Sequence, residues 1–243
     1  ATSDLHEPTA LLQLSANRVN QSADECTCLK WSEVYATGDA KCGEALETYT
    51  YSKTVGDTRK SNFHWCDGVS LYPRQKENYC TKVWQASPLP ARPDGFRHQT
   101  WCYVSEKCAS LNGGSSVNGK VSWKACEPGK DKLLADLPPA EIIKLAQRDQ
   151  IDLGLLTQMA YRVLKGKTFS QVRKHFLGGT TSSIPELLDP RPIIICERSA
   201  PPQVAQYDPC GHGETFVAYG KEVWRMDDKV CRTGDPGCTK YAS

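Results

Sequence analysis

The segment from Cys210 to Glu214 holds the residue types that most suggest chemistry in this chain. It places His212 and Glu214 two positions apart, a spacing found in zinc deaminases, where the histidine binds zinc and the glutamate moves protons. In those enzymes the pair precedes a Pro-Cys-x-x-Cys element. Here Pro209 and Cys210 come first, and no second cysteine follows at that spacing. We therefore interpret the segment as a glycine-rich loop anchored by a half-cystine.

A second candidate couples His64 with Cys66, since a thiolate nucleophile needs a base nearby. Residues this close in sequence seldom meet in the required geometry, and Cys66 is expected to be oxidised. The other histidines, His6, His98 and His175, are isolated, and the GxSxG, GxGxxG, P-loop and HExxH motifs do not occur. The sequence therefore favours a protein that is not an enzyme, without cofactor or metal site. An unrecognised hydrolase stays as an alternative, because paired carboxylates leave no sequence signature.

Twelve cysteines dominate the composition, eight before residue 130 and four after residue 190. Zinc knuckles need paired CxxC or HxxxH elements, but no CxxC occurs here. An even count without such elements favours disulfides formed in an oxidising compartment. We predict that the first eight pair among themselves and the last four likewise, with connectivity left open by the spacing. The predicted half-cystines are Cys26, Cys28, Cys42, Cys66, Cys80, Cys102, Cys108, Cys126, Cys196, Cys210, Cys231 and Cys238.

The N-terminal half divides into two expected parts. Residues 1–25 are an arm whose leucines fit a short docking helix or a loose end. Residues 26–130 are a disulfide-rich module with five of the six tryptophans, whose rings are expected to pack on the disulfides. An exposed sugar-binding platform of tryptophans is the alternative. In this module Trp31 to Tyr35 fits a helical turn, residues 48–51 alternate like a strand, and Asn118-Gly119 predicts a hairpin with a two-residue turn.

Residues 131–180 lack cysteine and change to a helical period. Pro138-Pro139 marks the start of a first helix. Asp152 caps a second helix, whose apolar stripe runs through Val163 and Leu164 to Gly166. A capping box at residues 168–171 opens a third. The basic side chains of this predicted three-helix unit are interpreted as a solvated outer face.

Residues 181–243 are the expected tail. Residues 184–188 fit one helical turn, and residues 193–196 fit one buried strand. Residues 215–219 and 222–226 flank Gly220-Lys221, which signals a type II′ hairpin. The predicted fold class is therefore α+β: a disulfide-rich, largely irregular N-terminal module, a small three-helix unit and a disulfide-bridged β-hairpin tail.

Charge and hydropathy argue against nucleic-acid binding and against a membrane-spanning segment. Thirty basic and 28 acidic side chains leave a net charge of +2, so no basic field for nucleic acid is expected. No apolar stretch reaches the length of a membrane span, and we expect no transmembrane segment of its own. The chain starts at Ala1 rather than methionine, from which we expect that a targeting peptide has been removed. Secretion and delivery to another oxidising lumen fit equally well.

The module resembles cysteine-rich proteins of dinoflagellate-type algae over roughly residues 26–126. The likeness rests on a Cys-x-Cys-x-x-Trp element, a Lys-Cys-Gly element and a Trp-Cys-Tyr-Val element followed by a cysteine. The residues that carry it are Cys26, Cys28, Trp31, Cys42, Gly43, Trp101, Cys102, Tyr103, Val104 and Cys108. The resemblance implies a non-catalytic accessory subunit in the plastid thylakoid lumen, bound to subunits of a photosystem–antenna membrane complex. A secreted carbohydrate- or protein-binding module, in the extracellular space, is the alternative.

Overall fold

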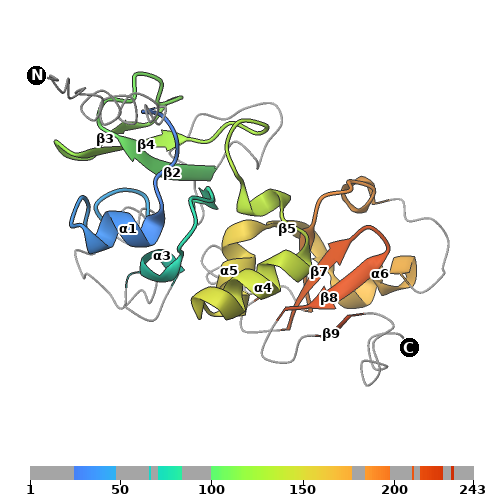
Figure 1. Cartoon of the computed structure of the whole chain (residues 1–243). Helices are drawn as coiled ribbons and strands as arrows, with labels where there is room; N and C mark the ends of the chain where they lie inside the picture. The colour runs from blue at the N-terminus through green and yellow to red at the C-terminus, as the bar shows by residue number, and fades with distance from the viewer. Residues whose placement is uncertain are drawn as a thin grey trace, which may run out of the picture.

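The computed structural model describes residues 25–47, 66, 71–83, 100–176, 184–197, 210, 214–226 and 231–232. These residues form two sheets and several short helices, so the predicted disulfide-rich α+β class is confirmed. Figure 1 shows the four-stranded sheet on one side of the molecule and the five-stranded sheet on the other, with α4 (Pro139–Asp149) and α5 (Leu153–Ala160) between them. Residues 1–24 of the expected arm and the expected strand at 48–51 lie outside the described residues.

The four-stranded sheet is antiparallel throughout, in the order β1-β2-β4-β3. Its strands are β1 (Thr81–Lys82), β2 (Thr100–Ser105), β3 (Ser115–Ser116) and β4 (Val121–Ala125). The expected two-residue turn at Asn118-Gly119 is wrong. Ser116 pairs with Ser122, so the turn takes in residue 120 as well. Asn118 explains the longer turn, because its Oδ1 accepts from the backbone N–H groups of Lys120 (2.8 Å) and Val121 (3.1 Å).

Aromatic rings fill the core beneath this sheet, together with α1 (Trp31–Ala36) and α3 (Leu71–Arg74). Trp31, Tyr72, Trp101 and Tyr103 are all buried. The Trp31 and Trp101 rings meet edge to face with centroids 4.8 Å apart, a favoured aromatic arrangement. Core packing is therefore confirmed for these two tryptophans and for the buried Trp123, rather than an exposed sugar platform.

The helical layer follows the predicted signals at its start. Pro139 is the first residue of α4, and Asp152 caps α5 by accepting from the Leu155 N–H at 2.7 Å. A short 3-10 helix, η3 (Leu134–Asp136), precedes them. Within the described part of the chain, no helix is both long and apolar enough to cross a membrane.

The predicted extension of the second helix through Leu164 is wrong. α5 ends at Ala160, and β5 (Arg162–Thr168) follows before α6 (Phe169–Phe176). The cause is tertiary: β5 pairs in parallel with β6 (Ile193–Cys196), where Val163 lies opposite Ile194. Strand geometry sends Val163 to the edge of the larger core, where it is half-buried, and Leu164 to a second core, where it is buried. The expected three-helix unit is thus interrupted by a strand.

The five-stranded sheet has the order β5-β6-β7-β8-β9. Its remaining strands are β7 (Thr215–Tyr219), β8 (Glu222–Arg225) and β9 (Cys231–Arg232), and 3-10 helix η4 (Pro185–Leu187) precedes β6. The predicted hairpin is confirmed: Tyr219 pairs with Glu222, and Gly220 takes the positive φ of 61° that the turn needs. The α6 segment is the crossover that parallel strands β5 and β6 require.

The two faces of this sheet belong to different cores. Ile194 and Val217 join the larger core, which also contains Trp31 and Trp101, whereas Ile195 and Phe216 join the second. One apolar cluster therefore continues from the disulfide-rich module through α4 and α5 to the inner face of the five-stranded sheet.

Candidate binding cleft beside two stacked disulfides

Five disulfides join the described cysteines: Cys26–Cys108, Cys28–Cys102, Cys42–Cys66, Cys80–Cys126 and Cys196–Cys210. The first eight cysteines pair only among themselves, as predicted. Cys196–Cys210 likewise stays within the last four. A bond between Cys231 and Cys238 remains a prediction, because Cys238 lies outside the described residues.

Two of these disulfides stack on each other in the interior. Cys28 Sγ lies 3.5 Å from Cys80 Sγ, although the two are not bonded, and the Sγ atoms of Cys28, Cys80, Cys102 and Cys126 all lie within 4.8 Å of one another. The sheet explains this meeting. Cys102 lies in β2, Cys126 follows β4 and Cys80 precedes β1, and the three strands are neighbours.

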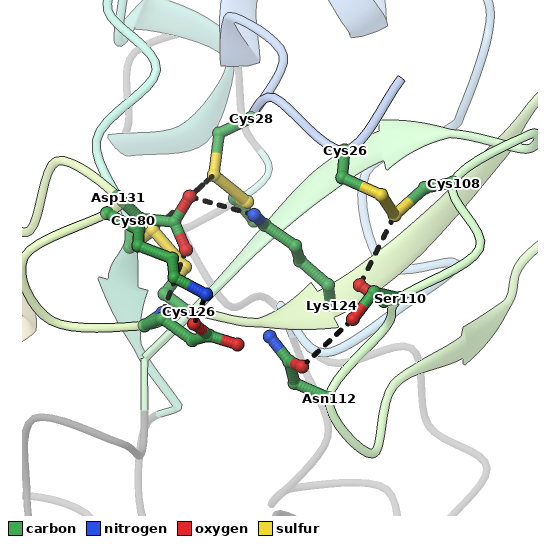
Figure 2. A network of polar contacts seen from close by, with 12 residues as sticks. Cys26, Cys28, Cys80, Cys108, Ser110, Asn112, Lys124, Cys126 and Asp131 are labelled. Atoms are coloured by element: carbon green, nitrogen blue, oxygen red, sulfur yellow. Dashed lines mark hydrogen bonds and ion pairs between the residues drawn. A yellow bond between two sulfur atoms is a disulfide. The ribbon is translucent and has the colours of Figure 1, made fainter. Parts of the chain in front are cut away.

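A polar cleft of about 420 Å³ opens beside this cluster. Cys28 forms part of its wall, and so do Cys26 and residues of the loops at 110–112 and 127–132. Ser110 Oγ donates to Asn112 Oδ1 at 3.3 Å, and the Asn112 amide donates to Ala125 O at 3.2 Å. The Cys26–Cys108 disulfide ties the segment at 26–28 to the chain just before the loop at 110–112 (Figure 2), and Cys28–Cys102 ties the same segment to β2.

A buried ion pair joins the cleft to the sulfur cluster. Lys124 Nζ lies 2.8 Å from Asp131 Oδ1, and the two side chains are only 8% and 9% exposed. Asp131 also accepts from the Glu127 N–H at 2.8 Å, and its Oδ1 lies 3.7 Å from Cys28 Sγ. Figure 2 shows Lys124 and Asp131 pointing toward each other beside the sulfur atoms. Each charge thus has a partner, as groups removed from water require.

The cleft holds two carboxyl groups, which raises the question of hydrolysis. A glycosidase-type pair needs one carboxylic acid whose pKa is raised so that it can donate a proton. The Glu127 carboxylate instead pairs with Lys130 at 2.6 Å, and this hydrogen bond lowers the pKa of Glu127. The Asp131 carboxylate is held by Lys124. The Glu127 carboxyl group therefore does not fit the role of such a general acid.

Of the residues first considered for chemistry, the described ones, Cys66, Cys210 and Glu214, do not line this cleft. Cys210 is bonded to Cys196, and Glu214 forms an ion pair with Arg225 at 2.9 Å. Cys66 is bonded to Cys42, so it is no thiolate nucleophile in this state. His64 and His212 lie outside the described residues.

Sequence reasoning missed a buried carboxyl group in the aromatic core. Glu47 Oε1 accepts from the hydroxyl groups of Tyr35 (2.8 Å) and Tyr103 (2.7 Å), and the Ala45 N–H donates to Oε2 at 3.1 Å. Burial raises the pKa of Glu47, against these hydrogen bonds, which lower it. The group links the loop after α1 to β2, and no local pattern around residue 47 signals it.

The cleft residues were missed for a similar reason. Lys124 occupies a strand position that the sequence does not distinguish from an exposed lysine, and its partner Asp131 lies in the following loop. Comparison with known proteins adds no further guide: no family model, curated protein or solved structure matches this chain.

Proposed function

We propose that the protein is a non-catalytic accessory subunit that docks on a larger membrane complex through this cleft. The observation that carries the proposal is the anchoring of the cleft walls by the Cys26–Cys108 and Cys28–Cys102 disulfides and by the Lys124–Asp131 ion pair. Walls that are already ordered lose little conformational entropy when a partner binds. A rigid polar recess of this kind supports recognition of a protein segment.

The charges of the cleft indicate the chemistry of that segment. Lys124 and Lys130 are paired with carboxylates, whereas Lys132 is exposed and has no ion pair within the described part of the chain. The lining therefore carries a surplus of one positive charge. Such a surface favours a loop of the partner that brings a carboxylate, because complementary charges steer encounter and fix register.

The disulfides and the resemblance direct the proposal to a compartment. Five disulfides are compatible with an oxidising environment. The resemblance of residues 26–126 to algal proteins points to the plastid thylakoid lumen and to subunits of a photosystem–antenna assembly as partners. The extracellular space is the alternative location.

Gentle detergent extraction of the source membranes followed by size fractionation tests the proposal. The protein is expected to migrate with a large pigmented particle. Elution near its own mass of 26.9 kDa, never with membrane complexes, would overturn the proposal. If that free protein then bound glycans, the secreted carbohydrate-binding alternative would replace it.

A charge reversal in the cleft makes the test specific. Rebinding of Lys132→Glu to particles stripped of the protein is expected to be at least about tenfold weaker, because like charges at an interface repel. Lys165→Glu is the matched control: it makes the same charge change on β5, away from the cleft, and should rebind normally. Equal rebinding of the two variants would remove the cleft from the docking surface.

A further inference from the structure

We propose that Cys28, Cys80, Cys102 and Cys126 form a zinc site when the protein is reduced. The inference goes beyond docking and does not depend on it. Within the described residues, these four are the one group of potential metal ligands whose donor atoms converge, with all Sγ atoms within 4.8 Å of one another. In the oxidised protein they make two disulfides, and in the reduced protein they offer four thiolates to one cation.

The distances fit tetrahedral coordination. Zinc binds thiolate sulfur at about 2.3 Å, so neighbouring sulfur atoms in a tetrahedral site lie about 3.8 Å apart. The non-bonded Cys28 and Cys80 sulfur atoms already lie 3.5 Å apart. The bonded pairs must separate, and their Cα atoms, 5.6 and 6.4 Å apart, leave room for this by side-chain rotation. The strands need not move.

The surroundings match a structural site. All four cysteines are buried, and structural zinc sites are closed by four protein ligands. Four thiolates and one Zn²⁺ leave two negative charges, which need compensation in the interior. The Lys124–Asp131 ion pair beside the cluster is neutral overall, with Asp131 Oδ1 3.7 Å from Cys28 Sγ, so it offsets these charges only by turning the Lys124 ammonium group toward the thiolates.

The cleft provides the route for reduction, because Cys28 lies in its wall. A dithiol attacks the Cys28–Cys102 bond and leaves as a cyclic disulfide, giving two electrons and two protons to the cysteines. The freed Cys28 thiolate can attack Cys80, which releases Cys126, and a second dithiol reduces the new disulfide. Zinc then displaces four protons from the four thiols, and no electron moves in that step.

Cobalt binding to the full chain, reduced with a phosphine under argon, tests the proposal. We expect one Co²⁺ per chain with the thiolate-to-cobalt absorption of a four-sulfur site, displaced by one equivalent of Zn²⁺. Mass-spectrometric mapping after alkylation should show that Zn²⁺ protects the cluster cysteines and leaves the others reactive. Protection of other cysteines instead, or of none, would overturn the proposal.

Matched double variants distinguish metal binding at the cluster from metal binding by other thiols. Cys28→Ser/Cys80→Ser should weaken cobalt binding by more than the roughly 100-fold that loss of an outer-shell partner costs. Cys42→Ser/Cys66→Ser removes as many thiols outside the cluster and should change the affinity less than about threefold. If the reduced chain unfolds, zinc should restore protease resistance to the control and not to the cluster variant. Zinc that refolds neither would also overturn the proposal.

Discussion

The two sheets of this protein are stabilised by different means. The four-stranded sheet contains β1 and β3, each only two residues long, and the four disulfides of the first eight cysteines hold its surroundings. The five-stranded sheet has the longer β5, β6 and β7, and a single disulfide is described there, Cys196–Cys210. Covalent links thus accompany the sheet whose two edge strands, β1 and β3, have only two residues each, although its central β2–β4 pairing is long.

The cores of the two regions also differ in the kinds of side chain that they contain. The module packs tryptophan and tyrosine rings together with the buried, hydrogen-bonded Glu47, whereas the second core contains apolar side chains such as Leu164, Ile195 and Phe216. Disulfides lower the entropy of the unfolded chain, which stabilises the folded state. This stabilisation lets the module keep loops that carry polar groups in fixed positions. The cleft lies in this cross-linked region. The comparison can be tested by perturbing each region and the layer between them.

The largest effect is expected in the helical layer that joins the two regions. Leu156 in α5 is fully buried, and Leu156→Asp would place a charge in the continuous core. The free energy of unfolding should fall by more than about 4 kcal/mol, measured by urea denaturation. Lys165→Ala, at an exposed position of β5, should stay within about 0.5 kcal/mol. Equal tolerance of the two changes would show that α5 does not support both sheets.

Removing a stacked disulfide should perturb the module in particular. Cys80→Ala/Cys126→Ala opens a link between positions 46 residues apart, and we expect a loss of about 4 kcal/mol. Cys196→Ala/Cys210→Ala, with a separation of 14, should lose about 3 kcal/mol. Hydrogen exchange should rise first in β2 and β4 for the former and in β6 and β7 for the latter. The same exchange pattern in both variants would mean that the regions are not stabilised separately.

The buried ion pair of the cleft gives a somewhat smaller effect. Lys124→Met leaves the Asp131 carboxylate without its cation at a site that is 9% exposed, so we expect a loss of about 3 kcal/mol. Adding Asp131→Leu should recover most of this loss, because the unpaired charge is then removed as well. Thermal unfolding of the single and double variants measures the coupling. Additive losses would show that the two groups do not depend on each other.

In the five-stranded region, an ion pair of Asp189 should make stability depend on pH. Hydrogen bonding from Arg191, with Arg162 nearby, lowers the pKa of Asp189 to about 2 from its usual 3.8. Because the folded-state pKa is the lower one, the stabilisation is complete above about pH 4 and disappears as the pH falls toward 2. Asp189→Asn should therefore cost roughly 2 kcal/mol at pH 7 and almost nothing near pH 2.

Glu141→Gln provides the matched control for that prediction. Glu141 pairs with Lys144 on the exposed face of α4, where ion pairs contribute little, and we expect a change below about 0.5 kcal/mol. Unfolding free energies of wild type and both variants across the acid range measure the effect. A difference between wild type and Asp189→Asn that does not vary with pH would contradict the assigned carboxylate.

Several features of the fold could be predicted because their causes are local. Pro139 starts α4, Asp152 accepts a hydrogen bond at the start of α5, and Gly220 permits the hairpin turn. Each depends on backbone conformations and hydrogen bonds within a few residues. The grouping of the cysteines could also be predicted, since the long cysteine-free stretch separates the two sets.

The end of α5 and the cleft were decided only by tertiary structure. Val163 and Leu164 fit a helix face as well as adjacent strand positions, and pairing with β6 selected the strand. The sulfur cluster likewise depends on strand order: β1, β2 and β4 had to become neighbours before Cys28, Cys80, Cys102 and Cys126 could converge. Strand partners and half-cystine partners lie far apart along the chain, so the free energy of the whole fold selects them rather than any local signal.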